Sequence, residues 1–133
     1  MTEKIFLSNT ISRRIEQLEP NNEEEVKMYC CGPTVYNYAH IGNLRTYIFE
    51  DLLAKTIRIA GYNLKHVMNI TDVGHLTSDA DTGEDKMLLA AEREKIEVLD
   101  LARKYERIFF EHTSFLGLNR PDIVARRTYR GYD

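Results

Sequence analysis

The sequence predicts an α/β protein in which helices flank a parallel sheet. Residues 26–31 and residues 64–70 are short apolar runs that read as buried strands. Between them, apolar side chains recur near helical spacing over residues 41–60. A strand, a helix and a second strand form a β-α-β unit, whose strands run parallel with a right-handed crossover. Such a unit opens a crevice at the carboxyl ends of its strands, where α/β sheets bind ligands.

The N-terminal part of the chain carries little pattern. Residues 4–7 are apolar enough for a short strand, and the polar, charged segment at residues 12–25 follows, broken at Pro20. This lead-in indicates no further element.

Glycines and charged residues mark where the helices end. Gly61 follows the first helical pattern and is expected to cap it. A second pattern covers residues 87–118, and an interruption in the charged run at residues 92–95 favours two helices over one. Residues 116–121 contain a helix stop and a turn. Residues 126–133 show no periodicity, so no closing element is expected, and a sheet of two or three readable strands is left open.

Composition bounds the class of protein. The chain of 133 residues has room for about one domain, and 43% hydrophobic with 29% charged residues is typical of a soluble globular protein. The apolar stretches are too short to span a bilayer and no charged-then-apolar leader opens the chain, so a cytoplasmic protein without membrane contact is expected. A net charge of −3 argues against a chain that mainly neutralises nucleic-acid phosphates.

The only two cysteines are neighbours, Cys30 and Cys31. Adjacent strand residues project to opposite faces, so a disulfide between them is geometrically poor and a reducing compartment fits. Cys30 is interpreted as a small buried apolar residue. Cys31 precedes Gly32 and Pro33 at the carboxyl edge of the strand, and there a buried role and a ligand-binding role are equally favoured.

Residues 40–43, His-Ile-Gly-Asn, begin the predicted helix. A helix start leaves backbone N–H groups unpaired and presents the positive end of the helix dipole, which binds anions. His40 and Asn43 lie one turn apart and can both donate hydrogen bonds, which suits a phosphate whose charge grows during nucleotidyl transfer. His40 could instead only cap the helix, but Gly42 allows close backbone approach to a ligand, which favours catalysis. Asn43 could also be a helix cap, and the two roles are compatible.

Three further patterns contain residue types that can take part in chemistry. Thr71 and Asp72 follow the second strand, where capping a turn and contacting a substrate are equally favoured. The acidic run at residues 79–85 resembles a calcium loop, but its glycine is one position early and Ala90 stands at the twelfth position, so a solvated turn is expected. The histidines apart from His40 are scattered over different elements, and they predict no closed four-ligand metal site: His66, His75 and His112.

Three segments together closely resemble one family: MYCCGPTVY at residues 28–36, HIGNLRT at residues 40–46 and NITD at residues 69–72. They are similar to cysteinyl-tRNA synthetases, which are class I aminoacyl-tRNA synthetases. The resemblance runs from about residue 9 to about residue 122, which is nearly all of this chain but only the first part of the family's. It implies that residues 1–133 form the N-terminal part of a Rossmann-like catalytic domain, incomplete here. The implied reaction is ATP-dependent activation of cysteine followed by transfer to tRNA(Cys).

The resemblance also implies roles for individual residues. Cys31 would be the first ligand of a zinc ion that binds the substrate thiolate, and Gly32 and Thr71 would help to hold the cysteine. A soft zinc–sulfur bond favours a thiolate over the hydroxyl of serine, so no editing would be needed. ATP, entering with Mg²⁺, would be contacted by a short set of residues: Thr34, His40, Gly42 and Asn43. Asn43 replaces the second histidine of the family signature, which changes the donor but keeps the ability to donate.

Several parts of the family pattern have no counterpart in this sequence. They are the Lys-Met-Ser-Lys-Ser loop, the later Cys, His and Glu zinc ligands, and the anticodon-binding region. The chain is therefore expected to be a fragment, inactive alone, with little metal binding at Cys31 and with tRNA contacts lying mostly elsewhere. Two alternatives stay open: a related ligase that joins cysteine to an amino sugar without tRNA, and a nucleotide-binding module without catalysis.

Overall fold

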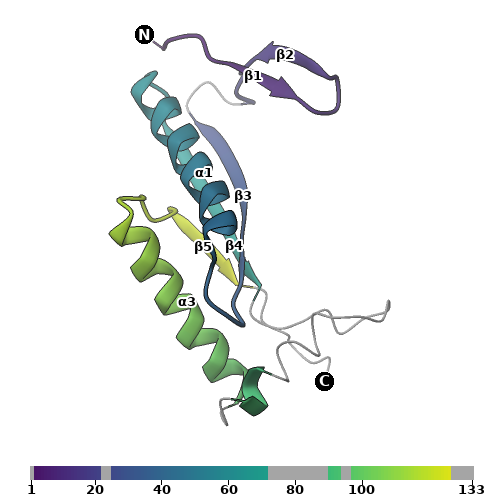
Figure 1. The fold of residues 1–133 in the computed structure, drawn as a ribbon. Coiled ribbons are helices and arrows are strands. Elements are labelled where there is room, and N and C mark those ends of the chain that lie inside the picture. Colours follow the sequence, from purple (N-terminus) through teal and green to yellow (C-terminus); the bar gives the residue numbers. More distant parts are fainter. Residues whose placement is uncertain (1, 22–24, 72–89, 94–96, 127–133) are drawn as a thin grey trace, which may run out of the picture.

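The computed structural model describes residues 2–21, 25–71, 90–93 and 97–126, and the statements below refer to these residues (Figure 1). The acidic run at residues 79–85, Asp72 and His75 lie outside them.

A three-stranded parallel sheet forms the centre of the fold. Its strands are β3 (Val26–Thr34), β4 (Leu64–Thr71) and β5 (Ile123–Arg126), in the order β3-β4-β5. Two of these strands enclose α1 (Ile41–Ile59) in the sequence, which confirms the predicted parallel β-α-β unit. The α/β class and the partial Rossmann-like architecture are as expected.

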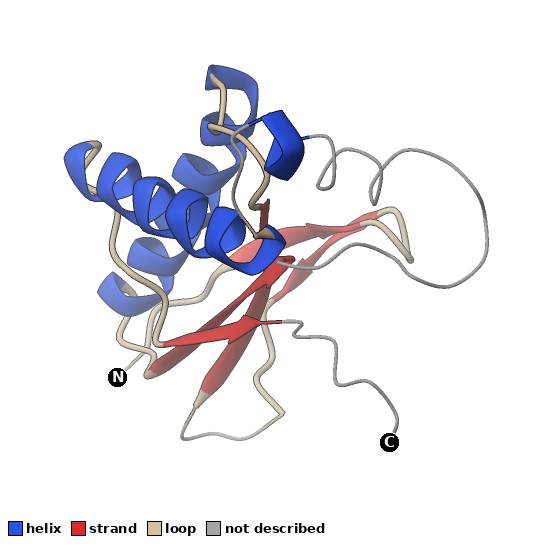
Figure 2. Cartoon of the chain, turned by 90° about the horizontal axis from the view of Figure 1, so that it is seen from below, coloured by secondary structure: helices blue, strands red, loops and turns tan. Residues whose placement is uncertain are grey.

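The helices lie together on one side of the sheet (Figure 2). α1 begins at the predicted residue, and Gly61 follows it with a φ of 91°, the left-handed backbone that a glycine cap supplies. The second helical pattern is interrupted as expected: residues 90–93 are helical, Glu97 is extended, and α3 (Val98–Phe115) begins after it. No described helix is long and apolar enough to cross a membrane.

Two clusters of apolar side chains fill the space between the helices and the sheet. The larger cluster joins the carboxyl ends of the strands to both helices, and its fully buried members include Val35, Ile70 and Leu101. The smaller cluster lies at the other end of α1, where Ala54 and Ile57 pack on Val26 and Leu64. Burying a large aliphatic side chain contributes about 1.5–3 kcal/mol, so these contacts fix how α1 lies on β3 and β4.

The N-terminal lead-in differs from the expectation. It forms an antiparallel hairpin of β1 (Phe6–Asn9) and β2 (Arg14–Gln17), so the predicted strand at residues 4–7 is displaced by two residues and β2 was missed. The sequence does not predict the hairpin because its side chains are nearly all exposed and do not alternate between apolar and polar. It is closed by a polar turn in which Arg13 has a φ of 58° and Asn9 bonds to Glu16 at 2.9 Å.

The sequence assigns no element to the residues between the turn at 116–121 and Arg126, but β5 lies there and adds a third parallel strand beside β4; residues 127–133 lie outside the described residues. Four residues are too few to show a period, so a tertiary anchor decides this strand. Asp51 on α1 accepts a hydrogen bond from the backbone N–H of Asn119 at 2.9 Å, and Asp122 accepts one from His66 at 2.7 Å. These two carboxylates fix the turn that leads into β5.

Candidate functional site

The end of β3 separates the two cysteines. Cys30 is buried beside Glu50 of α1, on the helix-covered face of the sheet, whereas Cys31 is exposed, and both are free thiols. The predictions of opposite faces and of no disulfide are confirmed. Cys31 therefore lies on the strand face that points away from the described helices.

Gly32 is required by the packing of two strands. Its N–H donates to Oδ1 of Asn69 at 3.0 Å, and a Cβ built on Gly32 would lie 2.0 Å from the Asn69 carbonyl oxygen. Any side chain here would push β3 away from β4, at the place where the strand register shifts between Cys31 and Thr34. The sequence presents Asn69 only as part of the NITD motif and does not predict its role in closing this junction.

His40 caps α1. Its Nδ1 accepts hydrogen bonds from the backbone N–H groups of Gly42 at 3.0 Å and Asn43 at 3.3 Å. In return, Oδ1 of Asn43 accepts one from the backbone N–H of His40 at 3.2 Å, which completes a capping box. The capping role that competed with catalysis is thus present in the structure.

The same contacts determine which atoms remain available for a ligand. An Nδ1 that accepts hydrogen bonds carries no proton, so the neutral imidazole of His40 holds its proton on Nε2. Asn43 likewise uses its oxygen in the cap and keeps its amide hydrogens. Two donors, Nε2–H and Nδ2–H, therefore remain at the positive end of the helix dipole.

Gly42 serves this cap. A Cβ at Gly42 would lie 2.9 Å from Cε1 and 3.1 Å from Nδ1 of His40, so a side chain would displace the imidazole. The sequence favours this glycine as room for a ligand that a capping histidine would not need, but the structure shows that the capping ring itself needs the room.

A cavity of about 250 Å³ opens beside the helix start. Three of the predicted ATP-binding residues line it, Thr34, His40 and Asn43, whereas Gly42 does not. Aromatic rings form much of the remaining wall, from the loop after β3, from α1 and from α3: Tyr36, Tyr38, Tyr47, Tyr105 and Phe109. Tyr38 packs edge-on against Tyr105, with ring centroids 5.2 Å apart.

The contribution of α3 to this wall was not predicted. Tyr105 and Phe109 stand four residues apart in the second helical pattern, so the sequence indicated an apolar face but not the cavity that it borders. Burial, with the charges of Glu50 and Cys31, raises the pKa of Tyr47 to about 12, so this phenol stays neutral and can donate.

The residues expected to hold the amino acid lie apart from this cavity. Cys31, Gly32 and Thr71 are absent from its lining, although Thr71 is paired with Thr34 across β3 and β4. The described residues thus bring Thr34, His40 and Asn43 together at the cavity. The residues expected to hold the substrate cysteine lie outside it, at the ends of β3 and β4.

A zinc site at Cys31 cannot be completed from the described residues. Among them, the one group of three possible ligand residues with neighbouring donor atoms does not include Cys31. A single thiolate does not make a site that requires about four donors. No chemical step is therefore assigned here to a metal at Cys31.

That group of ligand residues lies on the buried side of β3 and consists of Cys30, Glu50 and His66. Burial, followed by the charges of Glu50 and Cys31, raises the pKa of Cys30 to about 12. Burial also raises the pKa of Glu50 to about 7, against a hydrogen bond from Cys30 that lowers it. Cys30 is buried as expected, but it is a hydrogen-bonding partner as well as a small apolar residue.

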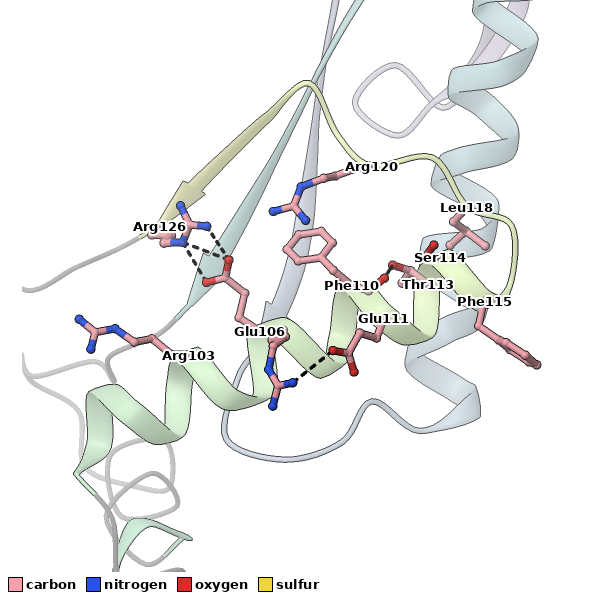
Figure 3. A pocket seen from close by; sticks show the side chains of 11 residues that line it. Arg103, Glu106, Phe110, Glu111, Thr113, Ser114, Phe115, Leu118, Arg120 and Arg126 are labelled. Carbon is pink, nitrogen blue, oxygen red and sulfur yellow. Dashed lines mark hydrogen bonds and ion pairs between the residues drawn. The ribbon is translucent and has the colours of Figure 1, made fainter.

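A second cavity, of about 890 Å³, lies between α3 and the chain that leads into β5 (Figure 3). Arg126 donates to both carboxylate oxygens of Glu106 at 2.6–3.1 Å, and the guanidinium of Arg120 lies 3.9 Å from the centre of the Phe110 ring. Its described lining contains none of the predicted site residues.

The geometry defines a class of protein: a parallel α/β domain whose first crossover helix leaves hydrogen-bond donors at its N-terminus, the kind of position where anions bind. Within that class, the chain belongs to the family described as tRNA synthetases class I (C) catalytic domain, whose model matches residues 17–130.

Curated relatives agree with this family. A protein named cysteine–tRNA ligase from Treponema denticola is 53% identical over 122 residues, which are 92% of this chain and 25% of that protein. Proteins of the same name from Borrelia hermsii and Zymomonas mobilis are 49% and 47% identical, over 89% and 93% of this chain and 24% of each protein. The chain thus spans about a quarter of the length of these relatives.

Proposed function

We propose that this chain is part of a cysteine–tRNA ligase, which activates cysteine with ATP and transfers it to tRNA(Cys). Family membership and the names of the relatives support the reaction class. The observation that carries the proposal is the capping box of α1, which uses the acceptor atoms of His40 and Asn43 and leaves their donors beside a cavity.

In this reaction the carboxylate of cysteine attacks the α-phosphorus of ATP. An O–P bond forms to give cysteinyl-adenylate, the bond to the bridging oxygen breaks, and pyrophosphate leaves. Negative charge grows on the phosphate oxygens in the transition state, where fixed donors act best. His40 Nε2–H and Asn43 Nδ2–H are the proposed donors, with Thr34 and the Gly42 region as the remaining ATP contacts and Mg²⁺ accompanying the nucleotide.

The amino acid is proposed to lie at the strand ends, against Cys31, Gly32 and Thr71. Cys31 is the proposed first ligand of the zinc ion, with its other ligands outside the described residues. The proposal also includes one catalytic-domain segment over residues 1–133, a cytoplasmic location, and tRNA contacts made mostly outside this chain.

The role of His40 is tested by a matched pair of variants in the protein made from the full reading frame. His40→Ala removes both the cap and the donor, whereas His40→Ser keeps a good capping residue without an imidazole. We expect both variants to lower cysteine-dependent pyrophosphate exchange by about 100-fold, the scale of one transition-state donor. Only His40→Ala should lower the melting temperature, since loss of a cap costs about 1 kcal/mol.

Unchanged exchange in His40→Ser would refute the donor role and leave His40 as a cap alone. Aminoacylation of tRNA(Cys) by the same protein then separates a tRNA ligase from an amino-sugar ligase, since both catalyse the exchange reaction.

A further inference from the structure

Three side chains from three different elements meet beneath α1, and none of them is among the residues proposed to bind ATP or cysteine. They are Cys30 of β3, Glu50 of α1 and His66 of β4. One possible ligand atom from each, a sulfur, a carboxylate oxygen and an imidazole nitrogen, lies within 4.8 Å of the other two. No sequence pattern indicates this group, because its members are separated by 20 and 16 residues and share no motif spacing.

The topology explains why they meet. Cys30 is paired with Met68 and His66 with Met28, so Cys30 and His66 are diagonal neighbours on the helix-covered face of adjacent strands. Glu50 stands one helical turn before Ala54, which is 1% exposed and packs on that same face. The carboxylate of Glu50 therefore lies over the two strand residues.

Two polar atoms of the group lack the partners that buried atoms normally have. His66 is 5% exposed, and its Nε2 has no hydrogen-bond partner; Oε2 of Glu50 is also buried without one. An unpaired buried polar atom is destabilising, and two of them in one group indicate that a bound species satisfies them.

The donor set identifies that species. Thiolate, imidazole and carboxylate together are ligands of Zn²⁺, whereas Mg²⁺ and Ca²⁺ prefer oxygen donors alone. Zinc bonds of about 2.0–2.3 Å place neighbouring ligand atoms about 3.3–3.8 Å apart, so atoms that lie within 4.8 Å of one another need to approach by at most about 1.5 Å. The rotatable side chain of Glu50 can supply this closure. One Zn²⁺ also balances the charges of one thiolate and one carboxylate, so the occupied site would bury no net charge.

We propose that Cys30, Glu50 and His66 bind one zinc ion between α1 and the sheet, separate from the zinc proposed at Cys31. Binding forms a Zn–S bond and releases the thiol proton of Cys30 to solvent. Three protein ligands leave a fourth position for water. The site ties α1 to β3 and β4 below the capping box, and it does not depend on the proposed function.

The test uses the protein made from the full reading frame, with Cys31→Ser as the background that removes the other zinc. Zinc content is measured by mass spectrometry after dialysis. The stripped protein is then titrated with Co²⁺, whose thiolate charge-transfer absorption reports a bound sulfur. We expect one equivalent of metal and this absorption in Cys31→Ser, and loss of both when Cys30→Ser is added.

Glu50→Gln and His66→Gln, each in the Cys31→Ser background, give independent readings if the double cysteine variant does not fold. We expect each to weaken Co²⁺ binding by at least about 10-fold, the lower end of losses caused by disturbed metal ligation. Absence of metal from folded Cys31→Ser would overturn the proposal. Retention of a full equivalent after Cys30→Ser would overturn it too, because the metal would then be held elsewhere.

Discussion

The side chain of His40 shows how one residue can serve structure and chemistry with different atoms. Nδ1 is occupied by two backbone N–H groups of α1, and this contact forces the proton onto Nε2. The cap therefore sets the tautomer that a phosphate donor needs. Capping competes with catalysis as an interpretation of the sequence, but it is compatible with the proposed donor role because the two use different ring nitrogens.

Gly42→Ala tests this coupling, because the new Cβ would lie 2.9 Å from Cε1 of His40. Alanine normally favours a helix over glycine by about 0.5–1 kcal/mol. Here we expect a lower melting temperature and slower pyrophosphate exchange, since the imidazole has to leave the cap. In a His40→Ser background the ring is gone, so Gly42→Ala should be neutral or stabilising by thermal denaturation. An equal effect in both backgrounds would contradict the coupling.

Glu50 predicts a pH dependence of stability for the metal-free protein. Burial raises the pKa of Glu50 from 4.5 to about 7, so the folded state binds the proton more tightly than the unfolded chain. The resulting penalty is absent below pH 4.5, grows as the pH rises to 7 and is constant above it. The free energy of unfolding of Glu50→Gln, minus that of the wild type, should therefore increase from pH 5 to pH 8. Urea denaturation with a chelator present measures this change, and parallel pH profiles for the two proteins would refute it.

At the scale of elements, β5 depends on a turn that two acidic residues hold. Asp122 accepts from the backbone N–H of His66 and pairs with Arg58 at 3.2 Å, so it links the strand that follows α3 to both β4 and α1. Asp51 of α1 accepts a hydrogen bond from the backbone N–H of Asn119 in the same turn, and it also pairs with Lys55. The position of β5 is thus set by residues far away in the sequence.

Asp122→Ala should lower the free energy of unfolding by about 1–3 kcal/mol, because it leaves the partly buried N–H of His66 without an acceptor. Glu111→Ala is the matched control: its pair with Arg107 is exposed on α3, and its loss should cost less than about 0.5 kcal/mol. Chemical denaturation measures both. Equal losses in the two variants would show that the turn is not anchored through Asp122.

At the scale of the whole molecule, the described sheet has two open edges. β3 and β5 each pair with β4 alone among the described residues, and the chain spans about a quarter of its relatives. The sheet face opposite the helices is also partly uncovered, with Tyr29 65% exposed. Exposed strand edges promote pairing with other chains.

The 133-residue chain expressed alone should therefore self-associate and show no pyrophosphate exchange. Light scattering across a concentration series and the exchange assay measure the two outcomes. A monodisperse monomer with exchange activity would contradict this expectation and would place a complete active site within these residues.

The sequence by itself determined the elements that have a long run of periodic apolar residues or a recognisable residue at their ends. The spacing of apolar residues located α1, Gly61 marked its end, and two apolar runs gave the parallel strands beside it. The motifs also indicated the residues at the start of α1, because a helix start needs capping and attracts anions wherever it occurs.

Tertiary structure decided what local pattern does not encode. β5 is held by Asp51 and Asp122 across the fold, and Tyr105 and Phe109 reach the cavity only because α3 packs beside α1. The distances from Cys30 to Glu50 and His66 depend on strand register and on the position of α1 over the sheet. Such contacts join residues that are distant along the chain, so they form only when the strands and helices pack together.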